Sequence, residues 1–126
     1  MSLRSPIGRA RGLGSAKEGT GHWWHQRISA IALLALTVWF VISLIVLTGA
    51  DWATASGWLA NKVNAGLMLL LIVFTFYHLK LGVQVVIEDY VHGEGMKIVS
   101  ILLVSGACLV GGLACALAVL DVAFGG

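Results

Sequence analysis

The sequence has 126 residues, of which 59% are hydrophobic and only 11% are charged, and its mean hydropathy is +0.93. Soluble domains carry about 25% charged residues, and a chain this short cannot enclose so much apolar surface in a core of its own. We therefore expect membrane lipid or partner subunits to cover the remainder. The net charge of +2 does not suggest nucleic-acid binding. The two cysteines form neither a CxxC nor a CxxCH motif, so zinc and covalent haem attachment are not predicted.

The first 24 residues are polar, glycine-rich and basic, and we expect them to form a cytoplasmic N-terminal segment. The positions from Ile28 to Thr48 carry no charge. These 21 residues are enough to cross a hydrocarbon core of about 30 Å, and we place the first span at about residues 27–48. Five of the eight Lys and Arg residues lie at or before its start, namely Arg4, Arg9, Arg11, Lys17 and Arg27.

Two further spans follow a short connection at residues 49–61, which carries tryptophans typical of a membrane interface, Trp52 and Trp58. The second span is predicted at about 62–88 and the third at about 97–121, with a polar turn between them. Residues 25–126 are thus predicted to form a membrane anchor domain, an all-α membrane protein of three transmembrane helices. The basic N-terminal segment predicts a cytoplasmic N-terminus and an external C-terminus.

Small residues crowd the third span, and two pairs have small-xxx-small spacing, Ala107/Gly111 and Gly112/Ala116. Such pairs let helices approach closely. This pattern predicts that the chain is part of a helix bundle, and it carries no information on chemistry.

His78 is the first ionisable residue after the apolar part of the second span. Ionisable groups at this depth cost several kcal/mol unless they are paired or used. Gly82 lies one turn away, where a flat rigid group could approach the backbone, and a neutral imidazole can donate a lone pair to haem iron. An interhelical hydrogen bond is the alternative explanation of a lone intramembrane histidine, and the residue type alone leaves both open.

The other histidines, His22, His25 and His92, are expected at or outside the cytoplasmic surface, about three turns from His78. A single haem iron cannot bridge that difference in depth. If His78 binds haem, we therefore expect the second axial ligand to come from another subunit.

Asp89 lies 11 residues after His78, which on a helix is about 20° away around the axis and about 16 Å along it. Together with Tyr90 it offers a carboxylate and a phenol, which suit a hydrogen bond to a quinone carbonyl with a proton route nearby. A role of Tyr90 in an aromatic belt is the alternative. Arg27 suits an anionic group such as a haem propionate, although an anchor at the positive-inside surface explains it as well.

The run FYHLKLGVQVVIEDYVHG, residues 76–93, closely resembles the signature of the hydrophobic membrane anchor of succinate dehydrogenase, respiratory complex II. The stretch GTGHWWHQRISAIAL, residues 19–33, resembles the approach to the first helix in the alphaproteobacterial and mitochondrial-like branch of that family. The three-span plan matches over nearly the whole chain. The spacing of His78, Asp89 and Tyr90 is the specific part of the resemblance, whereas the third span and N-terminal tail are not specific.

The resemblance implies that the chain is half of a heterodimeric transmembrane bundle in the inner (cytoplasmic) membrane. It implies that His78 is an axial ligand of a haem b shared with the cytochrome b subunit. It also implies ubiquinone binding by Tyr90 and Asp89, and a propionate contact by Arg27. The flavoprotein and iron–sulfur subunits would dock on the cytoplasmic face, and electrons from succinate, in the citric acid cycle, would pass through them to quinone and the respiratory chain. The chain itself has no motif for flavin or iron–sulfur clusters, so it is expected to perform no succinate chemistry.

Two other functions remain open from the sequence. One is a haemless anchor of the fumarate reductase type with only a quinone site, against which His78 argues. The other is a small transporter or channel component that uses Lys80, Gln84 and Glu88 as an ion path, and such a protein would function without soluble partners. The resemblance assigns no role to Lys80.

Overall fold

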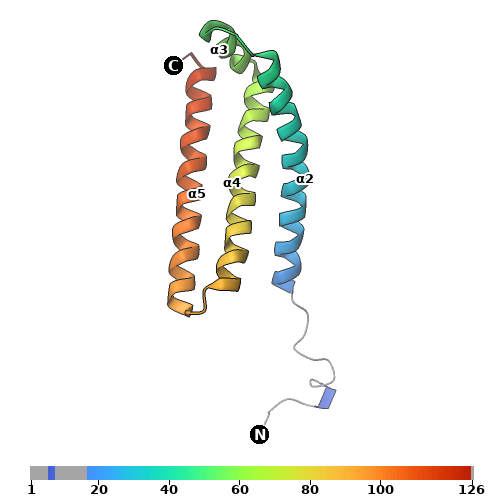
Figure 1. Ribbon diagram of the computed structural model, residues 1–126, viewed down its shortest axis with the longest axis vertical. Helices are drawn as coiled ribbons and strands as arrows, with labels where there is room; N and C mark the ends of the chain where they lie inside the picture. The colour runs from blue at the N-terminus through green and yellow to red at the C-terminus, as the bar shows by residue number, and fades with distance from the viewer. Residues whose placement is uncertain (1–5, 8–16, 126) are drawn as a thin grey trace.

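The computed structural model describes residues 6–7 and 17–125, and side chains from residue 20 onward in the second of these ranges. It is all-helical within this part of the chain, with α2 (Lys17–Val46), α3 (Trp52–Ala60), α4 (Lys62–Tyr90) and α5 (Glu94–Ala123) in sequence order (Figure 1). Three of the helices are long and apolar enough to cross a membrane, over Thr20–Val46, Lys62–Tyr90 and Glu94–Ala123. The predicted all-α plan with three transmembrane helices is therefore confirmed. Arg4, Arg9 and Arg11, on which the predicted orientation depends, lie outside the described residues.

Two features of the helices were not predicted. Helix α2 begins ten residues before the predicted span at about 27, because the polar approach to this span is itself helical. The connection at residues 49–61 contains a nine-residue helix, α3. Its sequence, WATASGWLA, is too short to span a membrane, so hydropathy alone gave no signal for it.

The ends of α3 are fixed by two polar side chains. Asp51 caps its N-terminus by accepting a hydrogen bond from the backbone N–H of Thr54 at 2.9 Å. Asn61 ends α3 and starts α4, since its side-chain oxygen accepts from the N–H of Val63 at 2.9 Å. The preceding turn after α2 passes through Gly49, whose φ of +79° is a conformation that glycine adopts without strain.

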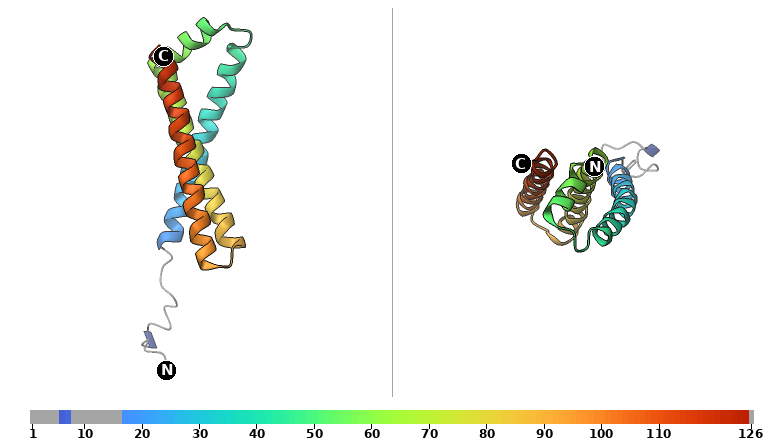
Figure 2. Two further views of the ribbon diagram at one scale, coloured as in Figure 1. Left: turned by 90° about the vertical axis from the view of Figure 1, so that its left-hand side faces the viewer. Right: turned by 90° about the horizontal axis from the view of Figure 1, so that it is seen from above.

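Helix α4 is the middle helix of the row. It packs against α5 on one side and α2 on the other, and within the described residues α2 and α5 do not pack against each other (Figure 1). The turned view in Figure 2 shows α2 crossing the other two helices and diverging from them toward the α3 end, where α3 lies across the opening. The three spans thus form an open row of helices rather than a closed bundle.

Very little of this row is enclosed by the chain itself. The most apolar windows of the three spans are 11%, 6% and 6% buried, so nearly all of their apolar surface faces outward. The described part of the chain has only five buried side chains, those of Ser29, Ser43, Leu81, Ile87 and Cys108. The expectation that lipid or partner subunits must cover the remainder is consistent with this exposure, and the chain is a multi-pass membrane protein.

The contact between α4 and α5 depends on adjacent glycines. A Cβ atom added at Gly111 would lie 2.9 Å from Cε1 of Phe76, and one at Gly112 would lie 3.4 Å from Cδ2 of the same ring. The aromatic ring of Phe76 therefore packs directly over the backbone of α5. The close approach predicted from the small residues of the third span is confirmed, and the partner is the chain's own second span.

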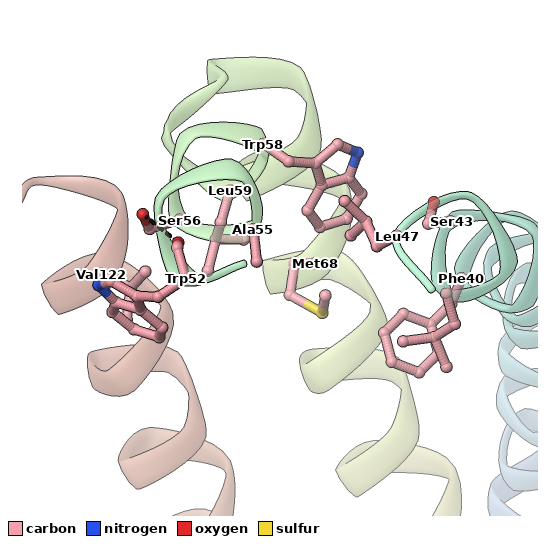
Figure 3. A pocket seen from close by; sticks show the side chains of 11 residues that line it. Phe40, Ser43, Leu47, Trp52, Ala55, Ser56, Trp58, Leu59, Met68 and Val122 are labelled. Atoms are coloured by element: carbon pink, nitrogen blue, oxygen red, sulfur yellow. Dashed lines mark hydrogen bonds between the residues drawn. The ribbon is translucent and has the colours of Figure 1, made fainter. Parts of the chain in front are cut away.

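Where α2 diverges, α3 covers an apolar pocket of about 210 Å³ between α2, α4 and α5 (Figure 3). Trp58 of α3 stacks on Trp39 of α2, with ring centroids 5.7 Å apart and an interplanar angle of 22°. The side chain of Asn64 donates to the carbonyl of Trp58 at 2.9 Å. These contacts attach α3 to both neighbouring spans at the end opposite His78.

Candidate functional site

His78 lies on α4 where this helix faces α2, and one of its ring nitrogens is held there. Its Nδ1 is 3.0 Å from Oγ of Ser29 on α2, and Ser29 is only 1% exposed. The other nitrogen, Nε2, makes no hydrogen bond within the described residues and is not among their enclosed polar atoms. The ring is therefore held by one nitrogen, and the second is available to a group outside this chain.

The contact between Ser29 and His78 is the interhelical hydrogen bond considered as the alternative to haem binding. Such bonds in membrane proteins contribute about 0.6 kcal/mol on average, so its effect on the stability of the bundle is small. Its effect on the ring is larger, because it fixes the orientation of an imidazole that would otherwise rotate. Hydrogen bonding at Nδ1 and ligation through Nε2 are compatible in one imidazole, so this bond does not exclude a haem ligand.

The face of α2 opposite His78 is polar for two further turns. His22, Gln26 and Ser29 follow one another at helical spacing, and we call these three residues with His78 the polar seam. Nε2 of His22 and Oε1 of Gln26 are buried without a hydrogen-bond partner in the described part of the chain. Buried polar atoms of this kind require a partner, so the seam has unused hydrogen-bonding capacity beside His78.

Gly82 also faces the polar seam. A Cβ atom at this position would lie 3.7 Å from Nε2 of Gln26, so the amide of Gln26 covers the space that we expected a flat group to use. The predicted role of Gly82 in haem clearance stays a prediction, and any haem would have to approach it from the side that Gln26 leaves open.

The predicted separation of about three turns between His25 and His78 is wrong. The hydroxyl of Tyr77 is 3.0 Å from Nδ1 of His25, and His78 is level with Ser29, only four residues further along α2. His25 is thus about 6 Å, one turn, from the level of His78 rather than three turns. The error arose because α2 continues as a helix through the polar approach and lies beside α4 there. Depth therefore does not require a second axial ligand from another subunit, and that expectation rests on the family resemblance.

Asp89 and Tyr90 lie in the last turn of α4, 11 and 12 residues beyond His78 on an uninterrupted helix, and this separation corresponds to about 16–18 Å. Both side chains are exposed, Tyr90 to 77%. Neither forms a hydrogen bond with any described residue. The chain alone therefore holds these two groups at one end of α4 and leaves their hydrogen-bonding capacity unused.

The remaining charged candidates lie close by. The guanidinium of Arg27 is exposed and packs over the ring of Trp23 at 5.2 Å, a cation–π contact that leaves its N–H groups free for an anion. Gln84 donates to Glu88 at 2.8 Å within α4. Lys80 makes no ion pair with described residues and borders an apolar groove between α4 and α5. An ion path along Lys80, Gln84 and Glu88 would need Gln84 and Glu88 to exchange this internal bond for solvent.

The site residues that sequence reasoning missed are Ser29 and Gln26. The signal was present in the spacing of His22, Gln26 and Ser29, which repeats every three to four residues and therefore marks one face of a helix. It was overlooked because only the uncharged run from residue 28 was treated as helix.

The donor set favours a ligand that needs a single nitrogen from this chain. The described residues contain no cluster of three or more His, Cys, Asp or Glu side chains able to hold a metal ion. A haem iron, already coordinated by the porphyrin, requires only axial ligands. An imidazole oriented through Nδ1 with Nε2 free fits that requirement.

The chain is similar to proteins of known type over most of its length. The profile described as "Succinate dehydrogenase/Fumarate reductase transmembrane subunit" matches residues 1–122. The succinate dehydrogenase hydrophobic membrane anchor subunit of Rickettsia conorii is 32% identical over 109 residues, 86% of each chain. The subunit of the same name from Rickettsia bellii is 36% identical over 89 residues, 71% of each chain. That from Paracoccus denitrificans is 32% identical over 97 residues, 77% of this chain and 75% of its own. No solved structure gives a significant match.

Proposed function

The chain belongs to the succinate dehydrogenase/fumarate reductase transmembrane subunit family, and from this premise we propose that it shares one haem b with a cytochrome b subunit and helps to form a ubiquinone site. It is a membrane anchor subunit of succinate dehydrogenase, and it associates with the other subunits of that complex and with lipid. In the proposed arrangement its N-terminus is on the cytoplasmic side of the inner membrane and its C-terminus is periplasmic. Electrons from succinate then reach quinone next to the last turn of α4.

The observation that carries the proposal is the state of the His78 ring. Its Nδ1 is hydrogen-bonded to a fully buried serine at 3.0 Å, and its Nε2 is left without a partner by the described residues. Leaving an imidazole nitrogen unsatisfied in an apolar environment is costly, so a ligand for it is expected. Bound haem would supply one-electron transfer at that position.

The residues of this chain would act by binding and positioning. His78 would hold the iron through Nε2, and Arg27 would bind a propionate through N–H groups that its contact with Trp23 leaves free. Tyr90 would donate its hydroxyl to a quinone carbonyl. Asp89, next to it and exposed, would accept or supply a proton at the membrane surface. Since neither residue has a partner in the described chain, the other walls of the quinone site would come from partner subunits.

The ligand assignment is tested by His78→Ala in the purified complex of all its subunits. We expect loss of the b-haem absorption bands with retained binding of the flavoprotein and iron–sulfur subunits. His92→Ala is the matched control, because His92 is exposed in the turn between α4 and α5 and should leave the spectrum unchanged. Normal haem ligation in the His78 variant would exclude the assignment. A wild-type complex without b-type haem would instead indicate the haemless anchor of the fumarate reductase type.

The quinone assignment is tested by Tyr90→Phe, which removes one hydroxyl. We expect a lower rate of succinate-dependent quinone reduction with unchanged succinate oxidation by artificial dyes, which accept electrons upstream. Tyr77→Phe, the same change in the chain's other tyrosine, should leave both rates unaltered. Equal loss of both rates in Tyr90→Phe would indicate failed assembly rather than a quinone contact. Purification of the chain without a flavoprotein would favour the transporter alternative.

A further inference from the structure

We propose that Ser29 is a positioning residue for the haem ligand: its hydroxyl oxygen accepts a hydrogen bond from the Nδ1–H of His78 and so leaves the lone pair of Nε2 available to the iron. This inference rests on the proposed function, in which His78 binds haem. It adds a residue on a different helix, and it assigns a consequence to the bond between them.

Two short contacts meet at the serine oxygen. Oγ of Ser29 is 2.9 Å from the carbonyl oxygen of Gln26, one turn earlier in α2, and 3.0 Å from Nδ1 of His78. A serine hydroxyl has one proton and two lone pairs, so it can donate in only one of these contacts. The other contact must therefore be one in which it accepts.

The contact with Gln26 decides in which of the two hydrogen bonds the serine hydroxyl donates. Its partner is a carbonyl oxygen, which can only accept, so two oxygens 2.9 Å apart without a proton between them would repel. The serine proton is therefore directed to Gln26, and Oγ offers a lone pair to His78. Nδ1 must then carry the proton of the neutral ring, and Nε2 carries none.

This arrangement is the tautomer that an axial ligand needs. Metal-binding histidines commonly donate their other ring N–H to an oxygen, which fixes the tautomer and the ring orientation and increases the basicity of the ligating nitrogen. The opposite tautomer would leave an Nε2–H without a partner in the described chain. Ser29 is 1% exposed, so water cannot replace it as the acceptor.

The position of Ser29 also explains why the bond is well defined. The hydroxyl is held by its bond to the helix backbone, and α2 is held against α4 at the polar seam, where Gln26 lies over Gly82. The oxygen is thus a fixed acceptor on a rigid helix, whereas a side chain on a loop would adapt to any ring orientation.

The test compares Ser29→Ala with Ser43→Ala in the whole purified complex. Ser43 is the matched control because it is also buried on α2 and donates to a backbone carbonyl one turn earlier, that of Trp39 at 2.8 Å, without touching a histidine. Ser29→Thr keeps the hydroxyl and should therefore keep the midpoint potential and EPR spectrum of the unaltered protein, although its added methyl group at a 1% exposed position lowers stability. The measurements are the midpoint potential of the haem, the low-temperature EPR spectrum of its ferric state, and the rate of haem transfer to excess apomyoglobin.

For Ser29→Ala we expect roughly 10- to 100-fold faster haem loss, a shifted EPR spectrum and a more positive midpoint potential. The potential rises because an imidazole without an acceptor at Nδ1 donates less electron density to ferric iron. A loss of packing alone would lower haem content without moving the potential of the remaining haem in this direction. If Ser29→Ala fails to assemble, Ser29→Cys keeps nearly the same volume with a weak acceptor and should change all three measurements in the same direction.

A potential, EPR spectrum and haem-loss rate equal to those of Ser43→Ala would overturn the role of Ser29 and leave the proposed function intact. Retention of haem in His78→Ala would overturn the proposed function itself. The two failures are therefore distinguished by different variants of the same complex.

Discussion

Replacing Gly111 by alanine should force a single methyl group into the ring of Phe76. The added Cβ would lie 2.9 Å from Cε1 and 3.2 Å from Cζ, closer than non-bonded carbons pack, which is about 3.5–4.0 Å. The same ring lies over the backbone of the next residue, because a Cβ atom added at Gly112 would be 3.4 Å from its Cδ2. It can move only outward, toward the groove of about 520 Å³ between α4 and α5, or push the two helices apart.

The magnitude follows from two opposing contributions. Overpacking by a methyl group costs about 1–3 kcal/mol, and the available groove favours the lower half of this range. Replacing glycine by alanine within a helix stabilises it by about 0.5–1 kcal/mol. Gly106→Ala isolates the second contribution, since no atom lies within 4 Å of its Cβ position. We therefore expect Gly111→Ala to be about 1–2 kcal/mol less stable than Gly106→Ala, with Gly112→Ala between them.

The assay is thermal unfolding of the purified complex in one detergent. Unfolding is monitored by the reaction of a thiol-reactive dye with Cys108, which is free and is buried in the folded chain. A Cys115→Ser background removes the exposed cysteine on the same helix. The double variant Phe76→Ala/Gly111→Ala should lose most of the penalty, because the atoms that meet the methyl group are gone. Equal stability of Gly111→Ala and Gly106→Ala would refute the close contact between Phe76 and α5.

Three further predictions concern α3, at the end of the bundle opposite His78, and the orientation of the chain in the membrane. Hydrogen bonds from Thr54, from its side chain first and then from its backbone N–H, lower the pKa of Asp51. The carboxylate therefore stabilises α3 fully at pH values above the ordinary pKa of aspartate. This contribution is lost as the pH falls through the lowered pKa of Asp51. The protection factors of the α3 amides in hydrogen exchange, which are corrected for the intrinsic effect of pH, should fall on that acidification in the unaltered protein, and Asp51→Asn should remove this pH dependence. The Trp39–Trp58 stack should give a coupling energy of about 0.5–1.5 kcal/mol in a double-mutant cycle of thermal stability, and additive single effects would contradict it. A reporter that is active only in the periplasm should be active when it is fused after α5. A reporter that is active only in the cytoplasm should be active when it is inserted in the turn after α4. The reverse pattern would contradict the proposed orientation.

The sequence was sufficient where a single physical property dominates. Long uncharged runs identified the three spans, because crossing a hydrocarbon core requires about 20 apolar residues whatever the tertiary structure is. The same property marked His78 as unusual, since an ionisable group in such a run needs a reason. The distance along the helix from His78 to Asp89 and Tyr90 could also be calculated from their spacing in the sequence, and α4 is an uninterrupted helix over all three residues.

The sequence was insufficient wherever residues far apart in the chain meet. Hydropathy placed the start of the first span at about residue 27. It therefore put His25 outside the span, away from the level of His78, and concealed the polar face that begins at His22. The helix α3 was missed because its nine residues carry neither a spanning length nor a distinctive charge pattern.

Hydropathy thus determined by itself that this chain enters the membrane three times and carries one histidine within the apolar depth of its second span. Only the tertiary structure decided that Ser29, 49 positions earlier, is the group that meets this histidine. The physical reason is that burial in lipid depends on the composition of each segment, whereas the pairing of Ser29 with His78 depends on how two helices are rotated and shifted against each other. That rotation and shift are determined by the packing of many side chains together, and no single segment of the sequence contains them.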